Sequence, residues 1–430
     1  MKRGALRAWP LQLSLALSLL LAPAVGRAEG EVSFRGYVKN FAILLAPPVP
    51  VWGGETADEP DLGAITTRLR LGLTLRPSDR VSFTCAYDIS PRLQSARLFS
   101  EAAFPSGPDP TAYRLTDLRD RIVPGAYETP TSFAVYQNLD RFAVTIKTRA
   151  ADIIVGRQAV AWGSARVVNP TDILAPFAFN ELDKEERTGV DAVRVRVPLG
   201  PMSELDIGAV AGLRFRAATS AFFLRGKTQA LDTDVSAVAM AFRRHLLLGV
   251  DLARSIGGAG AWLEAAYVVP AAFSGYEEDE EKDYFRASAG LDYSFGPKTY
   301  GFVEYHFSSA GGKEPDSYLG LAGTTPFRGG AVYLLGRHYV SLGGTYQITP
   351  LLPFTGLVIA NLGDLSLVLA PSLELNLSQN VYLAGGAYLG LGKRPEFLAS
   401  PPGPGARPDL LCSEFGSYPD MIYASFRVYF

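Results

Sequence analysis

The chain is poor in the residues that build disulfide frameworks, metal centres and catalytic triads. Its 430 residues include only two cysteines and three histidines. Cys85 lies in a strand-like run and Cys412 in a proline-rich loop, so we expect both to be unpaired. The sequence indicates no metal site and no cofactor.

The chain also lacks long apolar runs beyond its N-terminal region. No later stretch reaches roughly eighteen unbroken apolar residues, which excludes membrane-spanning helices. The apolar run at 11–25 is about fifteen residues long, too short for a comfortable helical span. Basic residues precede it and small residues follow it, which predicts a secretory signal peptide at 1–28, cut after Ala28. A membrane anchor is the alternative, and the length of the run disfavours it.

An excess of positive charge is absent as well. The predicted signal peptide holds four of the 41 Lys and Arg residues and no Asp or Glu. The mature chain therefore has 41 − 4 = 37 basic residues against 43 acidic ones, a formal net charge of −6. This balance argues against nucleic acid as a partner.

What the sequence does contain is a period-two pattern with many glycines and aromatic residues. At the C-terminus, apolar residues at 422, 424, 426, 428 and 430 alternate with Tyr423, Ser425 and Arg427. The same alternation recurs at 65–75 and 364–377 over about ten residues, the length of a tilted membrane-crossing strand. The polar face carries full charges, which the core of a soluble sandwich would reject. The pattern predicts strands with one face toward lipid and one toward a wet interior.

The connections between these strands alternate between short and long. Short turns are expected at 76–79, 147–152, 198–204, 229–234, 257–260, 295–298, 349–353 and 377–380, and long ones at 46–63, 91–131, 163–187, 270–283, 309–336 and 391–417. This habit is typical of outer-membrane barrels with short periplasmic turns and long outer loops. We therefore predict one all-β domain at 29–430, a transmembrane antiparallel up-and-down β-barrel of about 18 strands (16–18). The last strand should pair with the first, at 31–40, so that no edge is left open in lipid.

With the apolar faces turned outward, the remaining charged side chains are predicted to line the pore. The basic candidates are Arg35, Lys39, Arg68, Arg70, Arg194, Arg196, Arg286 and Arg427, and the acidic candidates are Asp251, Glu264, Asp292, Glu304 and Glu374. The first strands and the last one are mostly basic, whereas the strands across 250–304 are mostly acidic. Opposed walls of this kind would create a transverse field over the bore. The alternative is that the charges are scattered and paired with neighbours.

The segment 155–180 is predicted to narrow the pore. Its candidate constriction residues are Arg157, Trp162, Arg166, Asn169 and Asp172. Arg157 shares parity with Val155 and would turn inward only if Gly156 permits a bulge. An external loop without contact to the bore is the alternative.

Short motifs in this segment resemble a known group of proteins. GRQ (156–158), WG (162–163), NPTD (169–172), GYVKN (36–40) and EYHFSS (304–309) resemble segments of Gram-negative outer-membrane barrels of the porin and alginate-export kind. The resemblance implies an outer-membrane location among lipid and lipopolysaccharide, and passive passage of a polar solute or a secreted polysaccharide. The terminal strand ending at Phe430 also resembles the signal that such barrels present to the barrel-assembly machinery.

Two other function classes remain open at this point. A non-conducting structural or adhesion barrel would act through long outer loops such as 91–131 and 391–417. A membrane-embedded hydrolase would need His306 with Ser308 or Ser309, but no GxSxG-type elbow accompanies them, and we predict no enzymatic activity. The acidic run at 275–283 fits a solvated loop or a divalent-ion bridge to lipopolysaccharide. A monomer and a homo-oligomer both stay open as alternatives.

Overall fold

The computed structural model describes residues 30–48, 51–52, 55–56, 61–100, 112–125, 132–177, 179–273, 282–321, 323–328, 332–397 and 408–430. The predicted signal peptide and most of the acidic run at 275–283 lie outside these residues, as do parts of 91–131 and 391–417. Within the described part of the chain, no helix has the length and apolar character needed to cross a membrane.

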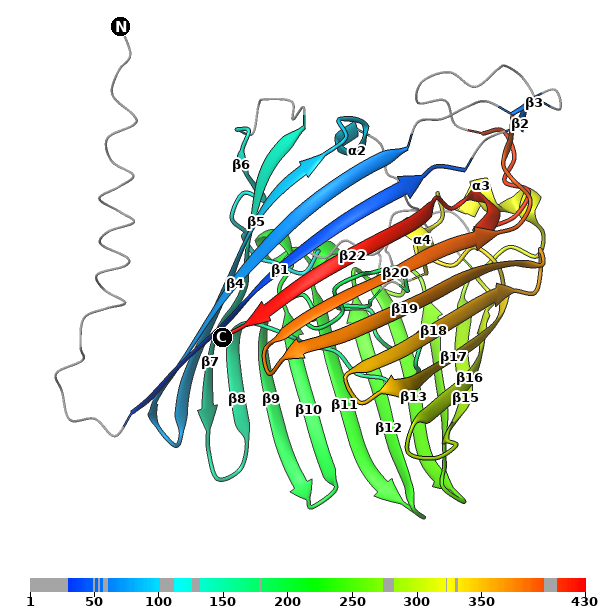
Figure 1. Cartoon of the computed structure of the whole chain (residues 1–430). Helices are drawn as coiled ribbons and strands as arrows, with labels where there is room; N and C mark the ends of the chain where they lie inside the picture. The colour runs from blue at the N-terminus through cyan, green and yellow to red at the C-terminus, as the bar shows by residue number, and fades with distance from the viewer. Residues whose placement is uncertain are drawn as a thin grey trace, which may run out of the picture.

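The main structure is a single antiparallel β-sheet closed into a barrel (Figure 1). Among the described residues, nineteen strands belong to the sheet, and one of them, β6 (Arg121–Val123), pairs there only with β7. The other eighteen form the ring, in the order β1 (Glu31–Ala46), β4 (Leu62–Ser78), β5 (Val81–Gln94), β7 (Phe133–Lys147), β8 (Asp152–Gln158), β9 (Val190–Gly200), β10 (Ser203–Val210), β11 (Ala221–Ala230), β12 (Thr233–Phe242), β13 (His245–Ile256), β14 (Ala259–Val269), β15 (Tyr284–Ser294), β16 (Thr299–Ser308), β17 (His338–Thr349), β18 (Leu352–Asn361), β19 (Ser366–Ser378), β20 (Val381–Leu391) and β22 (Asp420–Tyr429). The predicted count of about eighteen strands is confirmed.

Small elements lie in the outer connections. The short strands are β2 (Val51–Trp52), β3 (Glu55–Thr56) and β21 (Glu396–Phe397), and the short helices are α2 (Arg97–Ser100), η1 (Leu213–Phe215), η2 (Ala217–Thr219), η3 (Pro315–Ser317), α3 (Tyr318–Leu321), α4 (Thr325–Arg328) and η4 (Phe415–Ser417). None of these elements belongs to the wall of the barrel.

The ring closes between the two ends of the chain, as predicted. β1 pairs antiparallel with β22 on one side and with β4 on the other, so that Lys39 lies opposite both Arg427 and Arg68. The Phe430 N–H donates to Gly36 O at 2.9 Å, and the Gly36 N–H donates to Phe430 O at 2.8 Å. The terminal aromatic residue thus completes the seam and leaves no strand edge open.

The connections at the two ends of the barrel differ in length. The eight predicted short turns all join consecutive strands at the end where β1 begins and β22 ends. The other end carries the long connections. Two of its turns, at 243–244 and 362–365, are nevertheless as short as the eight turns just described, which we call the inner turns. Arg243 and Arg244 both adopt positive φ, at 45° and 73°, which lets a two-residue turn join β12 to β13. These two turns depart from the expected alternation of short and long connections.

The outer surface of the barrel is apolar, as the period-two pattern predicts. On β4, Ile65, Leu71 and Leu75 are exposed, while Arg70 on the opposite parity is buried. Such a surface is stable only in contact with lipid, because burial in an apolar medium stabilises apolar area by about 25 cal/mol per Å².

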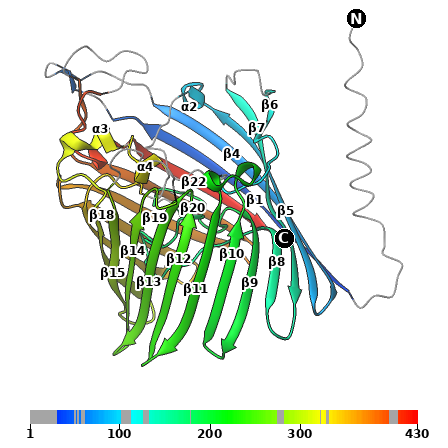
Figure 2. The ribbon, with the colours of Figure 1, turned by 180° about the vertical axis from the view of Figure 1, so that it is seen from behind.

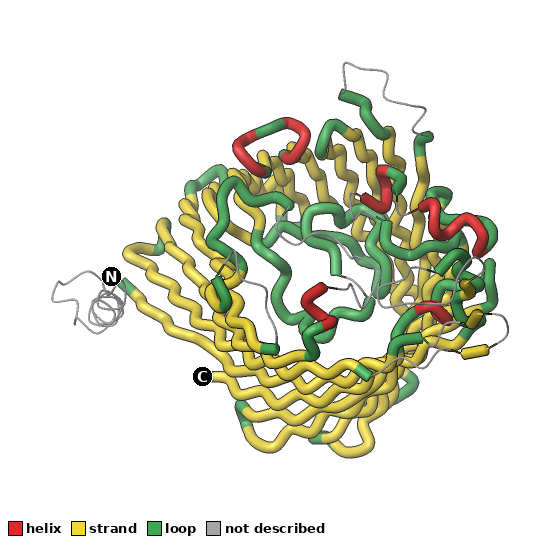
Figure 3. The backbone as a smooth tube through the Cα atoms, turned by 90° about the horizontal axis from the view of Figure 1, so that it is seen from above, coloured by secondary structure: helices red, strands yellow, loops and turns green. Residues whose placement is uncertain are grey.

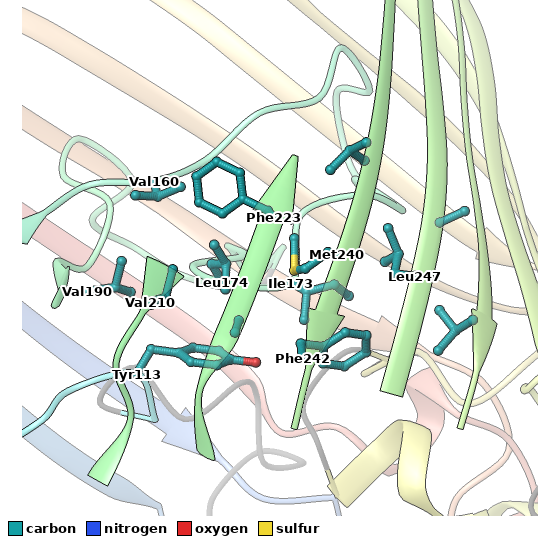
Figure 4. Close-up of a cluster of buried hydrophobic side chains, with 14 of the residues drawn as sticks. Tyr113, Val160, Ile173, Leu174, Val190, Val210, Phe223, Met240, Phe242 and Leu247 are labelled. Carbon is teal, nitrogen blue, oxygen red and sulfur yellow. The ribbon is translucent and has the colours of Figure 1, made fainter. Parts of the chain in front are cut away.

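The interior contains an apolar cluster that the sequence analysis did not predict. Inward side chains of β11 to β13, including Phe223, Met240 and Leu247, pack against Val160 and Leu174 from the connection after β8 (Figure 4). The expected polar lumen is therefore wrong for this part of the wall. The sequence did contain a sign of this cluster. Apolar residues follow one another without alternation at 221–224, 238–242 and 246–250, which indicates strands buried on both faces.

Candidate functional site

The connection between β8 and β9, residues 159–189, crosses the inside of the barrel; we refer to it as the crossing segment. Its first half contacts side chains of β13 to β16, and its second half contacts side chains of β1 and β4. β1 and β4 lie in front in Figure 1, and β9 to β13 lie in front in the reverse view of Figure 2. Seen from above, loops occupy the interior of the barrel (Figure 3). The alternative of an external loop without contact to the bore is wrong.

Near the end of β8, just before the crossing segment, Gly156 has a φ of +116°, which L side chains rarely adopt. A Cβ at this position would lie 2.2 Å from Phe142 O, so only glycine fits. The distortion redirects Arg157, which is buried rather than exposed to lipid. Its guanidinium group bonds Asp191 at 2.7 Å and Asp117 at 2.8 Å. Arg157 therefore turns inward without the bulge on which that prediction depended, because β8 keeps a continuous register with β7 and β9 through Gly156 and Arg157.

Glu304 on β16 holds the first half of the crossing segment by its backbone. Its carboxylate accepts hydrogen bonds from the N–H groups of Arg166 at 2.6 Å and of Val167 and Val168 at 3.1 Å. The indole Nε1–H of Trp262 on β14 donates to the same carboxylate at 3.0 Å. Glu304 is 1% exposed, so these four donors replace water as its partners.

Glu264 on β14 makes a second anchor of the same kind. It accepts from the N–H and hydroxyl groups of Thr171, at 2.9 and 2.7 Å, from Ala165 N–H at 3.1 Å and from Asn169 Nδ2 at 3.1 Å. Gly163, with φ +113°, allows this approach, because a Cβ there would lie 2.7 Å from Glu264 Oε2. The predicted constriction residue Asn169 is therefore an anchoring side chain.

Two further acidic residues of this wall bond side chains of the segment. Asp251 on β13 accepts a hydrogen bond from Ser164 Oγ, and Asp292 on β15 forms an ion pair with Arg166 at 2.7 Å. Trp162 packs edge-on against Phe223, with ring centroids 4.9 Å apart. The acidic wall is thus largely covered by the crossing segment.

The basic wall is covered by the second half of the segment, with the opposite chemistry. Lys39, which is 0% exposed, forms ion pairs with Asp183 at 2.7 Å and with Glu185. Arg68 bonds the other oxygen of Asp183 at 3.0 Å, and Arg70 lies 3.5 Å from Glu186. Carboxylates of the segment therefore meet cations of β1 and β4.

The other predicted pore-lining cations have local partners. Arg194 pairs with Asp206 and Arg196 with Glu204 across neighbouring strands, both at 2.6 Å, and Arg427 pairs with Glu374. Arg35 is exposed. Arg286 is 2% exposed, and its Nε and Nη1 atoms have no hydrogen-bond partner among the residues that the structure describes. The picture of two bare charged walls facing water is thus corrected: most of these charges are paired or covered.

Asp172 closes the crossing segment on itself by an ion pair with Arg187 at 2.7 Å. Complete burial of the Asp172 carboxyl raises its pKa to about 7, and the nearby Arg187 cation opposes that rise. Protonation of Asp172 near neutral pH would remove the carboxylate partner of Arg187, whose guanidinium also donates to Ala175 O at 2.6 Å. Asp172 is buried within the crossing segment, and its ion pair holds the Arg187 side chain in position.

A cavity of about 310 Å³ opens between the crossing segment and the inner faces of β16 to β18. Its cations are Arg166, Lys184 and Arg187, and its rings are Phe177, Phe179, Tyr300 and Phe302. Lys184 donates to Phe179 O at 2.8 Å, which is a neutral partner, and burial lowers the pKa of Lys184. Thr345 and Thr355 add hydroxyl groups to the lining. The cavity combines positive charge, aromatic faces and polar hydroxyls.

The sequence analysis missed the charged run ELDKEER at 181–187, which supplies Asp183, Lys184, Glu185, Glu186 and Arg187. Its signal was visible, because seven residues with six charges directly follow the predicted constriction. A run of this kind beside a wall of opposite charge would have indicated pairing across the bore.

The contacts of His306 do not support the hydrolase alternative. His306 Nδ1 lies 2.8 Å from Ser288 Oγ, and Ser288 Oγ donates to Val168 O at 2.6 Å. His306 and Ser288 are both buried beneath the crossing segment. The expected partners Ser308 and Ser309 are not involved, and a substrate could not reach the pair.

No family model matches the chain, and the search of curated proteins finds no match. Solved structures do match over almost the whole length. OccAB2 of Acinetobacter baumannii has a TM-score of 0.52 at 11% identity, covering 93% of this chain and 98% of that chain. OccK8 (OprE) of Pseudomonas aeruginosa has a TM-score of 0.53 at 8% identity, with the same coverage of 93% and 98%. The fold is that of the Occ porins.

A third match is OccK2 (OpdF) of Pseudomonas aeruginosa, solved in complex with glucuronate. Its TM-score is 0.52 at 9% identity, covering 93% of this chain and 98% of that chain. The porin part of the resemblance noted in the sequence agrees with this fold. The alginate-export part has no support from these matches.

Proposed function

We propose that the protein is an outer-membrane channel of a Gram-negative bacterium that passes small polar solutes by diffusion, with a preference for carboxylate-bearing sugars. The cavity beside the crossing segment carries this proposal. Lys184, whose hydrogen-bond partner Phe179 O is neutral, favours a carboxylate, and the ion-paired Arg166 and Arg187 add further guanidinium donors beside it. The rings suit the apolar face of a sugar and the hydroxyls its polar edge. The fold shared with Occ porins supports the channel, and the glucuronate bound to OccK2 is an example of the proposed solute class.

The size of the opening argues against an exported polysaccharide. The crossing segment spans the bore and is fixed at both walls by buried contacts. A polymer would need a continuous wide channel, whereas this cavity is at the lower end of the roughly 300–1,000 Å³ usual for small-molecule sites. An adhesion barrel that conducts nothing is not favoured by a polar cavity within the bore. Recognition by the barrel-assembly machinery and a homo-oligomer stay predictions.

The test is solute permeation through the purified mature protein in phosphatidylcholine vesicles. We expect glucuronate to enter faster than glucose, because only glucuronate gains the charge-assisted contacts. In K184Q/R187Q, the preference should fall by about tenfold, the loss expected for one such contact. The variant K298Q/R149Q removes the same charges at inner turns and should keep the preference. Equal entry of the two sugars in the wild type would overturn the proposed preference, and absence of any permeation would overturn the channel.

A further inference from the structure

Two neighbouring outer connections carry positive charge without any acidic residue. Residues 211–220 join β10 to β11, and 243–244 join β12 to β13; together they hold four arginines and no Asp or Glu. The Arg243 N–H donates to Ser220 O at 3.0 Å, so the two connections lie side by side at the rim. Arg214, Arg216 and Arg244 are exposed, whereas Arg243 lies over the Tyr113 ring.

Exposed apolar side chains accompany these cations. Phe215 is 71% exposed and Leu213 is 54% exposed, although both belong to the same outer connection as Arg214. The next connection adds Phe273, which is also exposed and whose N–H donates to Arg244 O at 3.0 Å. Apolar groups gathered on an outer rim indicate contact with something other than water. Aromatic residues beside cations are typical of the level where lipid headgroups lie.

The backbone of both connections includes residues with left-handed φ values. Arg214 and Phe215 have φ of 56°, and Arg243 and Arg244 have φ of 45° and 73°. Glycine or asparagine suits such positions, and a branched or long side chain there is unfavourable. At 243–244 the two-residue turn itself requires positive φ, as it does at Leu231 and Asp232 between β11 and β12. Arg214, Phe215 and Arg244 are exposed at these positions, so their side chains are accessible to a ligand.

Resting on the proposed outer-membrane location, we propose that this arc of the rim binds the phosphate groups of lipid A, the phosphorylated glycolipid of the outer leaflet. Arg214, Arg216 and Arg244 supply the guanidinium donors, which match phosphate oxygens in pairs. Leu213 and Phe215 supply the apolar contact with the acyl chains below the phosphates. The bound lipid would fix the barrel's outer edge at β10 to β13, on the side where the crossing segment packs against the wall.

The experiment measures retention of lipid A by the mature protein in phosphatidylcholine nanodiscs, with bisphosphorylated and dephosphorylated lipid A compared. The wild type should retain the phosphorylated form. R214N/R216N/R244N should retain it at least about tenfold less, as the loss of charge-assisted bonds predicts. Asparagine tolerates the positive φ of positions 214 and 244, and position 216 has an ordinary φ of −74°, so this variant should fold and resist heat at least as well as the wild type. R80N/R149N/R254N removes three exposed arginines at the opposite end of the barrel, two in short turns and Arg254 near the end of β13, and should retain lipid A as the wild type does.

Each contrary result overturns the proposal in its own way. Equal retention by R214N/R216N/R244N would exclude these arginines, and equal retention of dephosphorylated lipid A would show an apolar contact only. Loss of retention in EDTA would assign it to divalent ions held by acidic residues, such as the run at 277–281. Displacement by inorganic phosphate alone would assign the site to a free anion. Glucuronate permeation needs no lipid A, so a failure of the proposed channel is distinguishable from a failure here.

Discussion

The two halves of the crossing segment are held at opposite walls by opposite chemistries. Residues 164–171 present mainly backbone N–H groups to the buried carboxylates Glu264 and Glu304. Residues 183–186 present side-chain carboxylates to Lys39, Arg68 and Arg70. Backbone anchors depend on the wall residue and tolerate changes in the segment, whereas side-chain anchors depend on charge at both partners. The first half should therefore be rigid, and the second half should respond to charge.

The largest effect is expected from Glu304→Ala. The change leaves three backbone N–H groups and the Trp262 indole N–H buried without an acceptor, which should cost about 3 kcal/mol or more of stability. The first half of the segment should detach from β16, and single-channel conductance should rise severalfold. Glu374→Ala is the matched control, because that carboxylate has one ionic partner, Arg427, and is partly exposed. An equal conductance change in Glu374→Ala would contradict the claim that Glu304 anchors the first half of the segment.

Lys39→Met should have the next largest effect. The methionine leaves Asp183 and Glu185 without their shared cation, at a cost of about 3 kcal/mol as for a broken buried pair. The loss is moderated because Arg68 still bonds Asp183. The measurement is the reversal potential in a salt gradient, which should shift toward cation preference. In K39M/D183N/E185Q the preference should return; its persistence would show that these charges do not act as one unit.

Gly163→Ala tests the packing of the first half by changing a residue of the crossing segment instead of a residue of the wall. The new Cβ would meet Glu264 and Asn169 within 2.8 Å, and the φ of +113° opposes any L side chain. We expect a loss of about 1–3 kcal/mol, measured by thermal unfolding in detergent. Gly226→Ala is the control, because a Cβ there meets no atom within 4 Å. If both variants unfold at the same temperature, the tight contact with Glu264 is absent.

The smallest effect concerns pH and Asp172. Its carboxyl pKa is raised to about 7 in the folded protein, so folding retains a proton that the unfolded chain loses above about pH 3.9. The stability from this proton is fully present below that unfolded pKa and is lost as the pH rises through about 7. Below about pH 7 the neutral Asp172 also leaves Arg187 without its carboxylate partner beside the cavity, so anion permeation should increase modestly. Asp172→Asn should remove both pH dependences; a slope unchanged in this variant would assign them to another group.

Much of the fold could be predicted because lipid and water impose a strict alternation. The alternation of apolar residues at 65–75 and at 422–430 predicted which side chains face outward. The turn residues predicted the positions of the eight inner turns. The free cysteines Cys85 and Cys412 were also correctly predicted. The alternation became ambiguous where inward residues are apolar as well, as in 221–224, because contact with another segment had replaced water.

The candidate site was predictable only in part. The sequence indicated that 155–180 enters the bore, and it identified Glu264 and Glu304 as inward carboxylates. It could not show that backbone N–H groups of the segment are their partners, since every residue carries such a donor and no side-chain pattern marks it. The pairing of Lys39 with Asp183 spans 144 residues, and periodicity carries no information on contacts of that separation.

The central claim is that the crossing segment, held at both walls, sets the aperture of the channel. The most direct test is single-channel conductance in planar bilayers of a variant in which residues 164–187 are replaced by a short Gly–Ser linker, with heat-modifiable gel migration to verify the closed barrel. We predict a conductance severalfold above that of the wild type and equal passage of glucuronate and glucose. A folded variant with wild-type conductance and wild-type preference would contradict the claim.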